Sequence, residues 1–288
     1  MVLILTAGSA GAAYRIAVTW AVTLFINLHR SQGREVISTL TRKTLPAGSG
    51  GSTSPNSRGL RDDDHYYDRL MVIYDRLYTH FGPRRWWPAD TPFEVIVGAI
   101  LTQNVAWKNV IQAITNLKSA GLLDPDAIYR AAEADLEPHI RPAGYFRSKA
   151  RKLKAFVNHL QQQYGGSLEA MFDRPLEELR PEMLAIYGVG PETADAILCY
   201  AGNYPIMVMD AYTRRAFHRL GFWEEKVTYD QMQAFFMTHL PRDTRLYNEY
   251  HALIDALANR ICRKKKPACP TCPLVDLCPR TGVIIAEE

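Results

Sequence analysis

One stretch decides the fold of this chain: it reads LAIYGVGPETA and runs from Leu184 to Ala194. We expect an apolar helix to stop at Gly188, a tight turn to end at Gly190, and the next helix to begin at Pro191, because proline favours the first helical position. Two glycines two residues apart permit a positive φ and let another molecule approach the backbone closely. Their amides and the following helix start favour an anion such as a phosphate. A plain helix–turn–helix stays open as the alternative, because Gly-x-Gly is common in such turns.

The sequence on both sides of this hairpin follows helical spacing. Apolar residues recur at the helical period between Leu70 and Leu77, and Thr91 before Pro92 predicts a capped helix that runs to Leu101. Further helices are expected around 110–117 and over 126–134, 148–163, 176–179, 181–187, 192–201, 211–220, 229–239 and 245–261. The one β-like run, Ile206–Met209, is short. The sequence therefore predicts an all-α fold.

Asp210 follows this β-like run directly and precedes a helix that contains Arg214 and Arg215. Its simplest role is to cap that helix, with the carboxylate accepting amide hydrogen bonds. Capping does not compete with a functional role, because the positive helix end favours the charged form of the carboxyl group. An ionised carboxylate fixed at the mouth of a cleft could stabilise an oxocarbenium-like sugar and orient a water molecule.

The hairpin glycines with Asp210 downstream resemble the helix-hairpin-helix DNA glycosylase superfamily, over about residues 65–280. The resemblance implies that Asp210 is catalytic and that the hairpin grips the DNA backbone. The hairpin residues in question are Gly188, Val189, Gly190 and Thr193. Ile100–Asn104 resembles the segment whose glutamine enters the duplex where the base is flipped, which implies this role for Gln103. Gly144–Ala150 resembles another stretch typical of the superfamily.

Glu192 departs from the bifunctional endonuclease III branch, which carries a lysine at this position, two residues after the second hairpin glycine. A glutamate cannot form the Schiff base that a strand-cleaving lyase needs. As an acid in the first turn of a helix, Glu192 also has a sufficient structural reason to be there. We therefore expect a monofunctional enzyme that resembles the endonuclease III-related branch, which includes alkylpurine glycosylases.

Four of the five cysteines gather near the C-terminal end: Cys262, Cys269, Cys272 and Cys278, with six, two and five residues between them. A tight group in a chain otherwise poor in cysteine favours a metal site over disulfides. Zinc is the generic alternative, although zinc sites more often use two Cys-x2-Cys pairs with a longer spacer. The spacing is similar to the 4Fe–4S loop of the endonuclease III family, and this resemblance implies an iron–sulfur cluster. Cys199 is expected in the core.

Charge is unevenly distributed along the chain. Residues 1–61 contain seven Lys or Arg and one acid, whereas the remainder has 27 basic and 29 acidic residues, so the net charge of +4 gives no argument for nucleic acid. Local clusters must carry that argument. The run Lys264–Lys266 lies between expected cluster ligands and would form an ordered basic knob for phosphates, with a merely solvated face as the alternative. A second basic cluster consists of Arg141, Arg147, Lys149, Arg151, Lys152 and Lys154, which with Arg214 and Arg215 could line a DNA-facing side.

Residues 1–61 differ from the rest in composition. Residues 2–28 are apolar apart from Arg15, yet the uninterrupted run Ile16–Leu28 is too short to span a bilayer comfortably, and no basic cluster precedes it. Residues 44–60 are rich in Gly, Ser and Pro, as in a disordered linker. We interpret 1–61 as an extension that is disordered or not part of the fold. We expect a cytoplasmic, DNA-associated protein, and do not favour a membrane anchor.

The expected architecture has two helical lobes. Residues 92–209 would form a helical barrel with the hairpin, and 62–91 would join 210–288 in an iron–sulfur domain, with DNA across the cleft and Asp210 at its base. The resemblance implies a base-excision-repair glycosylase that flips a damaged nucleotide out of double-stranded DNA and hydrolyses its N-glycosidic bond. We expect a monomer with no small-molecule cofactor beyond the cluster. A bifunctional endonuclease III-like glycosylase/AP lyase and a non-catalytic DNA-binding iron–sulfur protein stay open as alternatives.

The excised base is not specified by the sequence. Trp86, Trp87 and Trp107 are candidates for pocket walls, since aromatic faces attract a cationic alkylated purine. The alternative for Trp86 and Trp87 is that they only pack the two lobes together.

Overall fold

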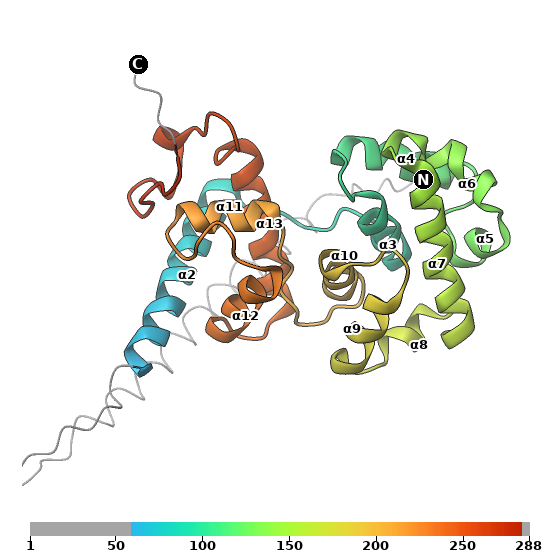
Figure 1. Ribbon diagram of the computed structural model, residues 1–288, viewed down its shortest axis with the longest axis horizontal. Helices are drawn as coiled ribbons and strands as arrows, with labels where there is room; N and C mark the ends of the chain where they lie inside the picture. Colours follow the sequence, from blue (N-terminus) through green and yellow to red (C-terminus); the bar gives the residue numbers. More distant parts are fainter. Residues whose placement is uncertain (1–58, 284–288) are drawn as a thin grey trace, which may run out of the picture. The chain divides into compact units, whose positions relative to one another are not determined.

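The computed structural model describes residues 59–283, and side chains from residue 65 onward (Figure 1). This part of the chain is built from helices and contains no strand, so the all-α prediction is confirmed. The expectations for residues 1–58, including the apolar segment 2–28 and most of the linker, lie outside the described residues.

The α-helices are α2 Gly59–Phe81, α3 Pro92–Leu101, α4 Trp107–Ser119, α5 Pro125–Arg130, α6 Glu133–Ile140, α7 Phe146–Tyr164, α8 Leu168–Phe172, α9 Leu176–Ala185, α10 Pro191–Ala196, α11 Ala211–Arg219, α12 Tyr229–His239 and α13 Thr244–Arg260. Short turns of other helix types are η1 Arg141–Ala143, η2 Ile197–Ala201 and η3 Cys269–Thr271.

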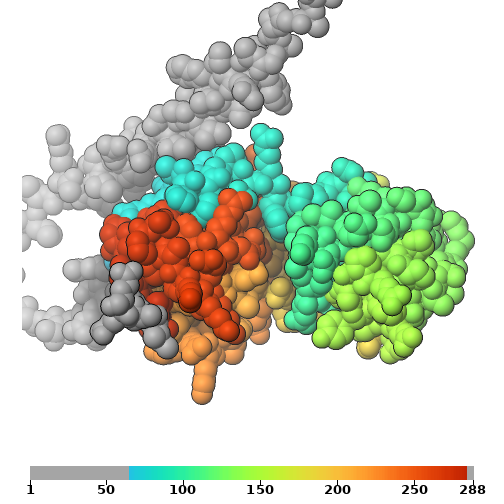
Figure 2. Space-filling view, turned by 90° about the horizontal axis from the view of Figure 1, so that it is seen from above, coloured from blue at the N-terminus to red at the C-terminus, as the bar shows by residue number. Residues whose placement is uncertain are grey.

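Two hydrophobic cores organise these helices. The first takes its buried side chains from α3 to η2, and the second from α2, α11, α12 and α13 together with Leu274. Burying apolar side chains in this way is the main favourable term in folding. The α2 helix, distant in sequence, lies beside the C-terminal loop, as Figure 2 shows in cyan and red, and Arg76 Nη1 there donates to Pro273 O at 3.3 Å.

The run Ile206–Met209 passes from one core to the other. Ile206 and Val208 belong to the first core, whereas Met207 and Met209 belong to the second. Extended backbone points successive side chains in opposite directions, so this short segment serves both cores. The cores show where apolar side chains pack and not which segments fold independently, so the predicted division at 92–209 stays a prediction.

Helices whose start is marked by a local sequence signal begin where they were expected. Thr91 accepts a hydrogen bond from Glu94 N at 3.1 Å, and α3 ends at Leu101 as predicted. Thr228 and Gln231 form a capping box at the start of α12, whose bounds also agree with the prediction. A side chain that satisfies a free amide fixes the helix start from local sequence alone.

Proline misled the prediction in the region before the hairpin. Two helices were expected on either side of Arg180, but α9 continues through Pro181. Buried Leu179 and Met183 flank the proline, and this packing offsets the missing amide hydrogen bond. The helix expected over 126–134 is likewise wrong in its bounds: α5 ends at Arg130, and α6 runs from Glu133 through Pro138 to Ile140.

The helix after the hairpin changes type halfway. A single helix was expected over 192–201, but α10 ends at Ala196 and a π-helical turn, η2, follows. Such turns often lie at functional sites, because they rotate the following side chains relative to an α-helix. This turn carries Cys199, which is buried as expected, and Tyr200.

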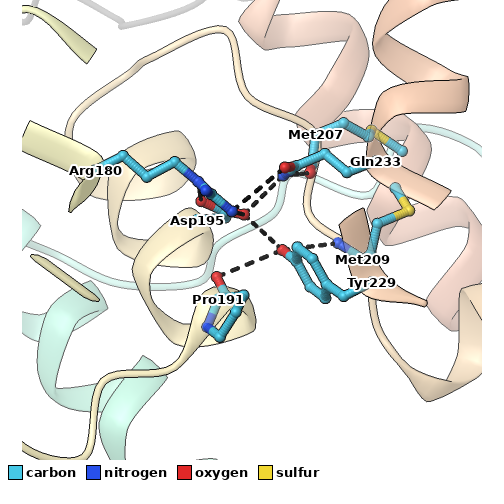
Figure 3. A network of polar contacts seen from close by, with 7 residues as sticks. All are labelled: Arg180, Pro191, Asp195, Met207, Met209, Tyr229 and Gln233. Carbon is cyan, nitrogen blue, oxygen red and sulfur yellow. Dashed lines mark hydrogen bonds and ion pairs between the residues drawn. The ribbon is translucent and has the colours of Figure 1, made fainter. Parts of the chain in front are cut away.

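A buried polar network joins α9, α10 and α12 (Figure 3). Asp195 is fully buried, and its carboxylate accepts hydrogen bonds from Arg180 Nε (2.7 Å) and Nη2 (3.0 Å), from the Tyr229 hydroxyl (2.8 Å) and from Gln233 Nε2 (2.7 Å). Gln233 Nε2 also donates to Met207 O at 2.7 Å. The network therefore fixes α10, the helix after the hairpin, against α12 and against the segment Ile206–Met209.

Within residues 59–283, no helix combines the length and the apolar character that crossing a membrane requires.

Candidate active site

The hairpin has the geometry that its glycines predict. Gly188 has φ +81°, and a Cβ at this position would lie 2.4 Å from Lys152 Cγ, so both the backbone conformation and the space require glycine. Gly190 is the N-cap of α10 and has open space around it. Val189 is only 5% exposed, and its side chain packs into the first core.

Gln103 folds onto this hairpin. Its Nε2 donates to Gly188 O at 3.0 Å and to Thr193 Oγ1 at 2.8 Å, and its Oε1 accepts from Lys152 Nζ. The structure thus brings together Gln103, Gly188 and Thr193, which the sequence analysis singled out separately. Lys152 was expected only as part of a basic surface, and its role as the partner of Gln103 was missed.

Asp210 caps α11, as its position before the helix predicted. Its Oδ1 accepts from Thr213 N at 2.6 Å, and its Oδ2 lies 3.5 Å from His251 Nε2. Burial alone would raise the pKa of Asp210, but His251 and the Thr213 amide outweigh it and hold the pKa below its usual value. The carboxylate is thus ionised, with the Asp210 side chain 12% exposed.

Glu192 lies in the first turn of α10, near Asp210. Desolvation by the surrounding protein raises its pKa to about 7, and the negative charge of Asp210 adds to the shift. Its side chain nevertheless remains accessible to solvent.

Tyr200 and His251 were missed by the sequence analysis. The Tyr200 hydroxyl lies 2.6 Å from His251 Nδ1, and the other ring nitrogen of His251 faces Asp210. His251 lies in an apolar stretch of α13 with no motif around it, so the sequence favours a core residue at this position. Tyr200 reaches it from the π turn, which local sequence did not predict.

Three tryptophans adjoin this group. The ring centroids of Trp86 and Trp107 each lie 5.0 Å from that of Trp87 and 5.9 Å from one another, and Trp87 lies 5.5 Å from Tyr200. Gly98 makes room for Trp87, since a Cβ there would lie 3.1 Å from the indole ring. Among the described residues, the indole nitrogens of Trp86 and Trp87 are buried without a hydrogen-bond partner, which leaves two donors unused.

The four C-terminal cysteines have free, half-buried thiols. Burial, with a smaller contribution from the other three cysteines, raises the pKa of Cys272 to about 11. In the described part of the chain, however, no three His, Cys, Asp or Glu side chains are gathered so that they could hold a metal ion. The donor set is chemically suited to an iron–sulfur centre, and the cluster stays a prediction.

Two arginines of α11 hold the loop around Cys262. Arg219 is 8% exposed, and its Nη1 donates to Arg263 O at 2.9 Å and to Cys262 Sγ at 3.3 Å. Arg215 Nε donates to Cys262 O at 2.9 Å. The side chains of Lys264, Lys265 and Lys266, farther along this loop, are exposed. The loop backbone is therefore fixed while its basic side chains remain accessible.

The second expected basic cluster is wrong in part. Lys149 is 2% exposed and donates to Leu101 O and Ala143 O, both at 2.8 Å, and its burial lowers its pKa to about 8. Lys154 donates to the carbonyl oxygens of Ile128 and Ala131. Sequence alone shows the charge of a lysine but not the carbonyl oxygens that the fold brings to it.

Comparison with known proteins places the chain in a family. A family model described as "HhH-GPD superfamily base excision DNA repair protein" matches residues 97–242. A putative DNA repair glycosylase of Methanocaldococcus jannaschii is 44% identical over 216 residues, which cover 75% of this chain and 98% of the relative. Endonuclease III of Sulfolobus acidocaldarius is 30% identical over 187 residues, which cover 65% of this chain and 81% of the relative.

Solved structures agree with this placement. An H. pylori 3-methyladenine DNA glycosylase bound to 1,N6-ethenoadenine is similar with a TM-score of 0.59 and 26% identity, over 68% of this chain and 97% of that chain. An endonuclease III–DNA complex is similar with a TM-score of 0.65 and 23% identity, over 74% of this chain and 95% of that chain, and shows the shared fold alone. The chain therefore belongs to the HhH-GPD superfamily of base excision DNA repair proteins, and it is a DNA glycosylase, as the hairpin and Asp210 predicted.

Proposed function

We propose that this glycosylase is monofunctional: it hydrolyses the N-glycosidic bond of a damaged base, an alkylated purine, and leaves the strand intact. Asp210 carries the reaction. Its carboxylate is ionised and largely buried, and only one of its oxygens is used in capping. The second oxygen faces His251 Nε2 at 3.5 Å and keeps acceptor capacity to stabilise the positive charge that develops on the sugar as the base departs, and to orient the attacking water.

Glu192 supports the assignment as monofunctional. It occupies the position at which a lyase would need an amine, and a carboxyl group cannot form a Schiff base with the sugar. Besides burial, the charge of nearby Asp210 raises the pKa of Glu192, and this proximity supports a place for Glu192 beside the reacting sugar. The product of this enzyme is thus an abasic strand that is cut only by alkali or by another enzyme.

The tryptophan group supports an alkylated purine. Trp86, Trp87 and Trp107 offer aromatic faces, which attract a cationic base. The indole nitrogens of Trp86 and Trp87 are buried without a hydrogen-bond partner, so they could donate to a base only once it has entered the tryptophan group. The similar H. pylori enzyme is a 3-methyladenine DNA glycosylase, and we extend this substrate class to the present chain.

Double-stranded DNA is the partner in this proposal. The hairpin backbone at Gly188, Val189 and Gly190 and the hydroxyl of Thr193 bind the phosphates of the damaged strand. Gln103 leaves its bonds with the hairpin to enter the duplex where the base is flipped. The exposed Lys264–Lys266 run adds phosphate contacts that do not depend on sequence. One monomer supplies all of these groups.

A 4Fe–4S cluster completes the proposal as a structural group. Cys262, Cys269, Cys272 and Cys278 would hold it, and it would tie the C-terminal loop together rather than take part in hydrolysis. Arg219 and Arg215 already fix the first part of this loop. Iron analysis of the purified protein tests this point, with about four irons expected, and one zinc without iron as the contradicting result.

A lesion panel tests the function. Purified full-length protein is incubated with duplexes that each carry one lesion: 3-methyladenine, 1,N6-ethenoadenine, a mismatched thymine or an oxidised pyrimidine. Free base and strand breaks are scored separately. We expect free alkylated purine and no break before alkali. Release of only thymine or an oxidised pyrimidine would overturn the substrate class, and binding without release of any base would favour a non-catalytic protein.

A further inference from the structure

His251 lies between Tyr200 and Asp210, and the family assignment gives it no role. It is 8% exposed, its Nδ1 lies 2.6 Å from the Tyr200 hydroxyl, and its Nε2 lies 3.5 Å from Asp210 Oδ2. Within the described residues, Nε2 is buried and makes no hydrogen bond of good geometry. A buried polar atom without a partner is costly, so this nitrogen, aimed at the carboxylate, calls for an explanation.

We propose that His251 is a positioning residue: Tyr200 anchors one of its ring nitrogens, and the other holds the Asp210 carboxylate ionised and correctly oriented for base release. The inference rests on the catalytic role proposed for Asp210. The distance of 3.5 Å is long for a hydrogen bond, but catalytic hydrogen bonds often tighten only when substrate binds.

The charges around the ring favour its protonated form. Asp210, Glu192 and Asp255 reach it from the loop before α11, from α10 and from α13. Burial alone would lower the pKa of His251, but these carboxyl groups raise it above its usual value. Nearby cations do not reverse this balance: burial raises the pKa of Asp255 and of Glu192, and Arg84 and Arg214 respectively only reduce these shifts.

Tyr200 determines how the charged ring is held. Burial raises the pKa of Tyr200 well above its ordinary value, so its hydroxyl stays neutral. In the imidazolium form both ring nitrogens are donors, so Nδ1–H donates to the Tyr200 oxygen and Nε2–H points at Asp210. Tyr200 also contacts Trp87. A base that packs on the tryptophans is thereby linked, through two side chains, to the carboxylate that acts on its sugar.

The sign of the pH dependence follows from these shifts. The His251 charge is present at low pH and is lost as pH rises through its raised pKa, whereas Asp210 is ionised at high pH and becomes protonated only below its lowered pKa. The rate of base release should therefore fall at both ends. Glu192, with a pKa of about 7, also titrates in this range, so the profile must be measured in a Glu192→Gln background.

The chain offers a matched control. His159 Nε2 lies 2.6 Å from Glu182 Oε1, which also accepts from the Tyr164 hydroxyl at 2.6 Å. This is the same combination of histidine, carboxylate and tyrosine, held by α7 and α9. His159→Gln and Tyr164→Phe thus remove equivalent interactions that have no part in the proposed reaction.

The test compares single-turnover base release by Glu192→Gln with and without His251→Gln, from about pH 3 to about pH 9, a range that covers the titration of both carboxyl groups and imidazole. We expect His251→Gln to slow release by about tenfold or more, to remove the alkaline decline and to move the acid decline to higher pH. Duplex affinity should be unchanged. Tyr200→Phe should lower the rate less and keep the alkaline decline, and His159→Gln and Tyr164→Phe should leave rate and profile unchanged. A His251→Gln profile with the shape of its parent would overturn the proposal, whatever its height.

A readout without substrate separates this inference from the function. In NMR titration of the full-length protein, the pKa of His251 should lie above that of a free histidine and fall in Asp210→Asn. An unchanged His251 pKa in that variant would overturn the contact. If the unsubstituted protein releases no base while the NMR result holds, the proposed function fails and the His251–Asp210 pair stands.

Discussion

Two aspartates, the fully buried Asp195 and the partly buried Asp210, differ in how completely their carboxylates are bonded. Asp195 accepts four hydrogen bonds, two of them from Arg180, and no oxygen is left over. Asp210 accepts one hydrogen bond of good geometry and faces His251 at a longer distance. A fully bonded carboxylate holds elements together, whereas one that keeps acceptor capacity can act on another molecule. The contrast marks Asp195 as structural and supports the catalytic role that we propose for Asp210.

The largest effect in this comparison is the loss of stability expected when Asp195 is replaced. Asp195→Ala should lower the free energy of unfolding by about 3–5 kcal/mol, because it leaves the Arg180 guanidinium poorly compensated in a largely buried site. Urea denaturation measures this change. Asp126→Ala is the control, because it removes only an exposed helical ion pair and should change stability by less than about 0.5 kcal/mol. Equal stability of the two variants would break the comparison.

For Asp210→Asn we expect the opposite result: a large loss of activity with little loss of stability. Asparagine caps a helix about as well as aspartate, so stability should change little. The loss of negative charge should slow base release by about 10²–10³-fold, or about 2.7–4 kcal/mol. Single-turnover kinetics measure the rate, and fluorescence anisotropy measures duplex affinity, which should remain. Activity within a few-fold of the unsubstituted enzyme would remove Asp210 from the catalytic role.

A smaller loss of stability is expected when only one hydrogen bond to Asp195 is removed. Tyr229→Phe deletes one of the four hydrogen bonds to Asp195 and leaves the Arg180 pair in place. A hydrogen bond to a charged group contributes about 1.5–3 kcal/mol, so the loss in unfolding free energy should lie in this range. If Tyr229→Phe were as destabilising as Asp195→Ala, the network could not be described as a sum of separate bonds around one carboxylate.

The same distinction between bonded and available groups applies to the cations. Arg219 is bonded to the loop backbone, whereas Lys264, Lys265 and Lys266 form no ion pair within residues 59–283. Replacing all three lysines with Ala should weaken binding to damaged and undamaged duplexes about equally and flatten the salt dependence by roughly one unit of slope per lost phosphate contact. Lys226→Ala, which removes one lysine outside this run, is the control. An unchanged slope would mean that the run is solvated surface.

The sequence predicted the structure correctly wherever a local signal determines it. Thr91–Pro92 placed the start of α3, and Gly188 is required by a positive φ that the hairpin motif indicates. Asp210 could be placed as a helix cap for the same reason.

The rest depends on contacts between residues far apart in the chain. His251 and Asp210 meet only because α11 and α13 pack together, and Tyr200 reaches them from a π turn that has no local signature. Lys149 looked like surface charge, yet the fold brings two carbonyl oxygens to it. Long-range pairing of this kind leaves no periodic pattern in the sequence.

Borohydride trapping on an abasic duplex tests the central claim most directly, because it asks whether any amine of this enzyme attacks the sugar. The unsubstituted protein, with Glu192 in place of the lyase lysine, should give no covalent adduct and an uncut strand, while a bifunctional endonuclease III in the same assay is trapped. Glu192→Lys provides a matched gain-of-function variant, in which a low level of trapping is expected. Efficient trapping of the unsubstituted protein would contradict the account, and its loss in Lys152→Arg would identify the amine next to the hairpin as the nucleophile.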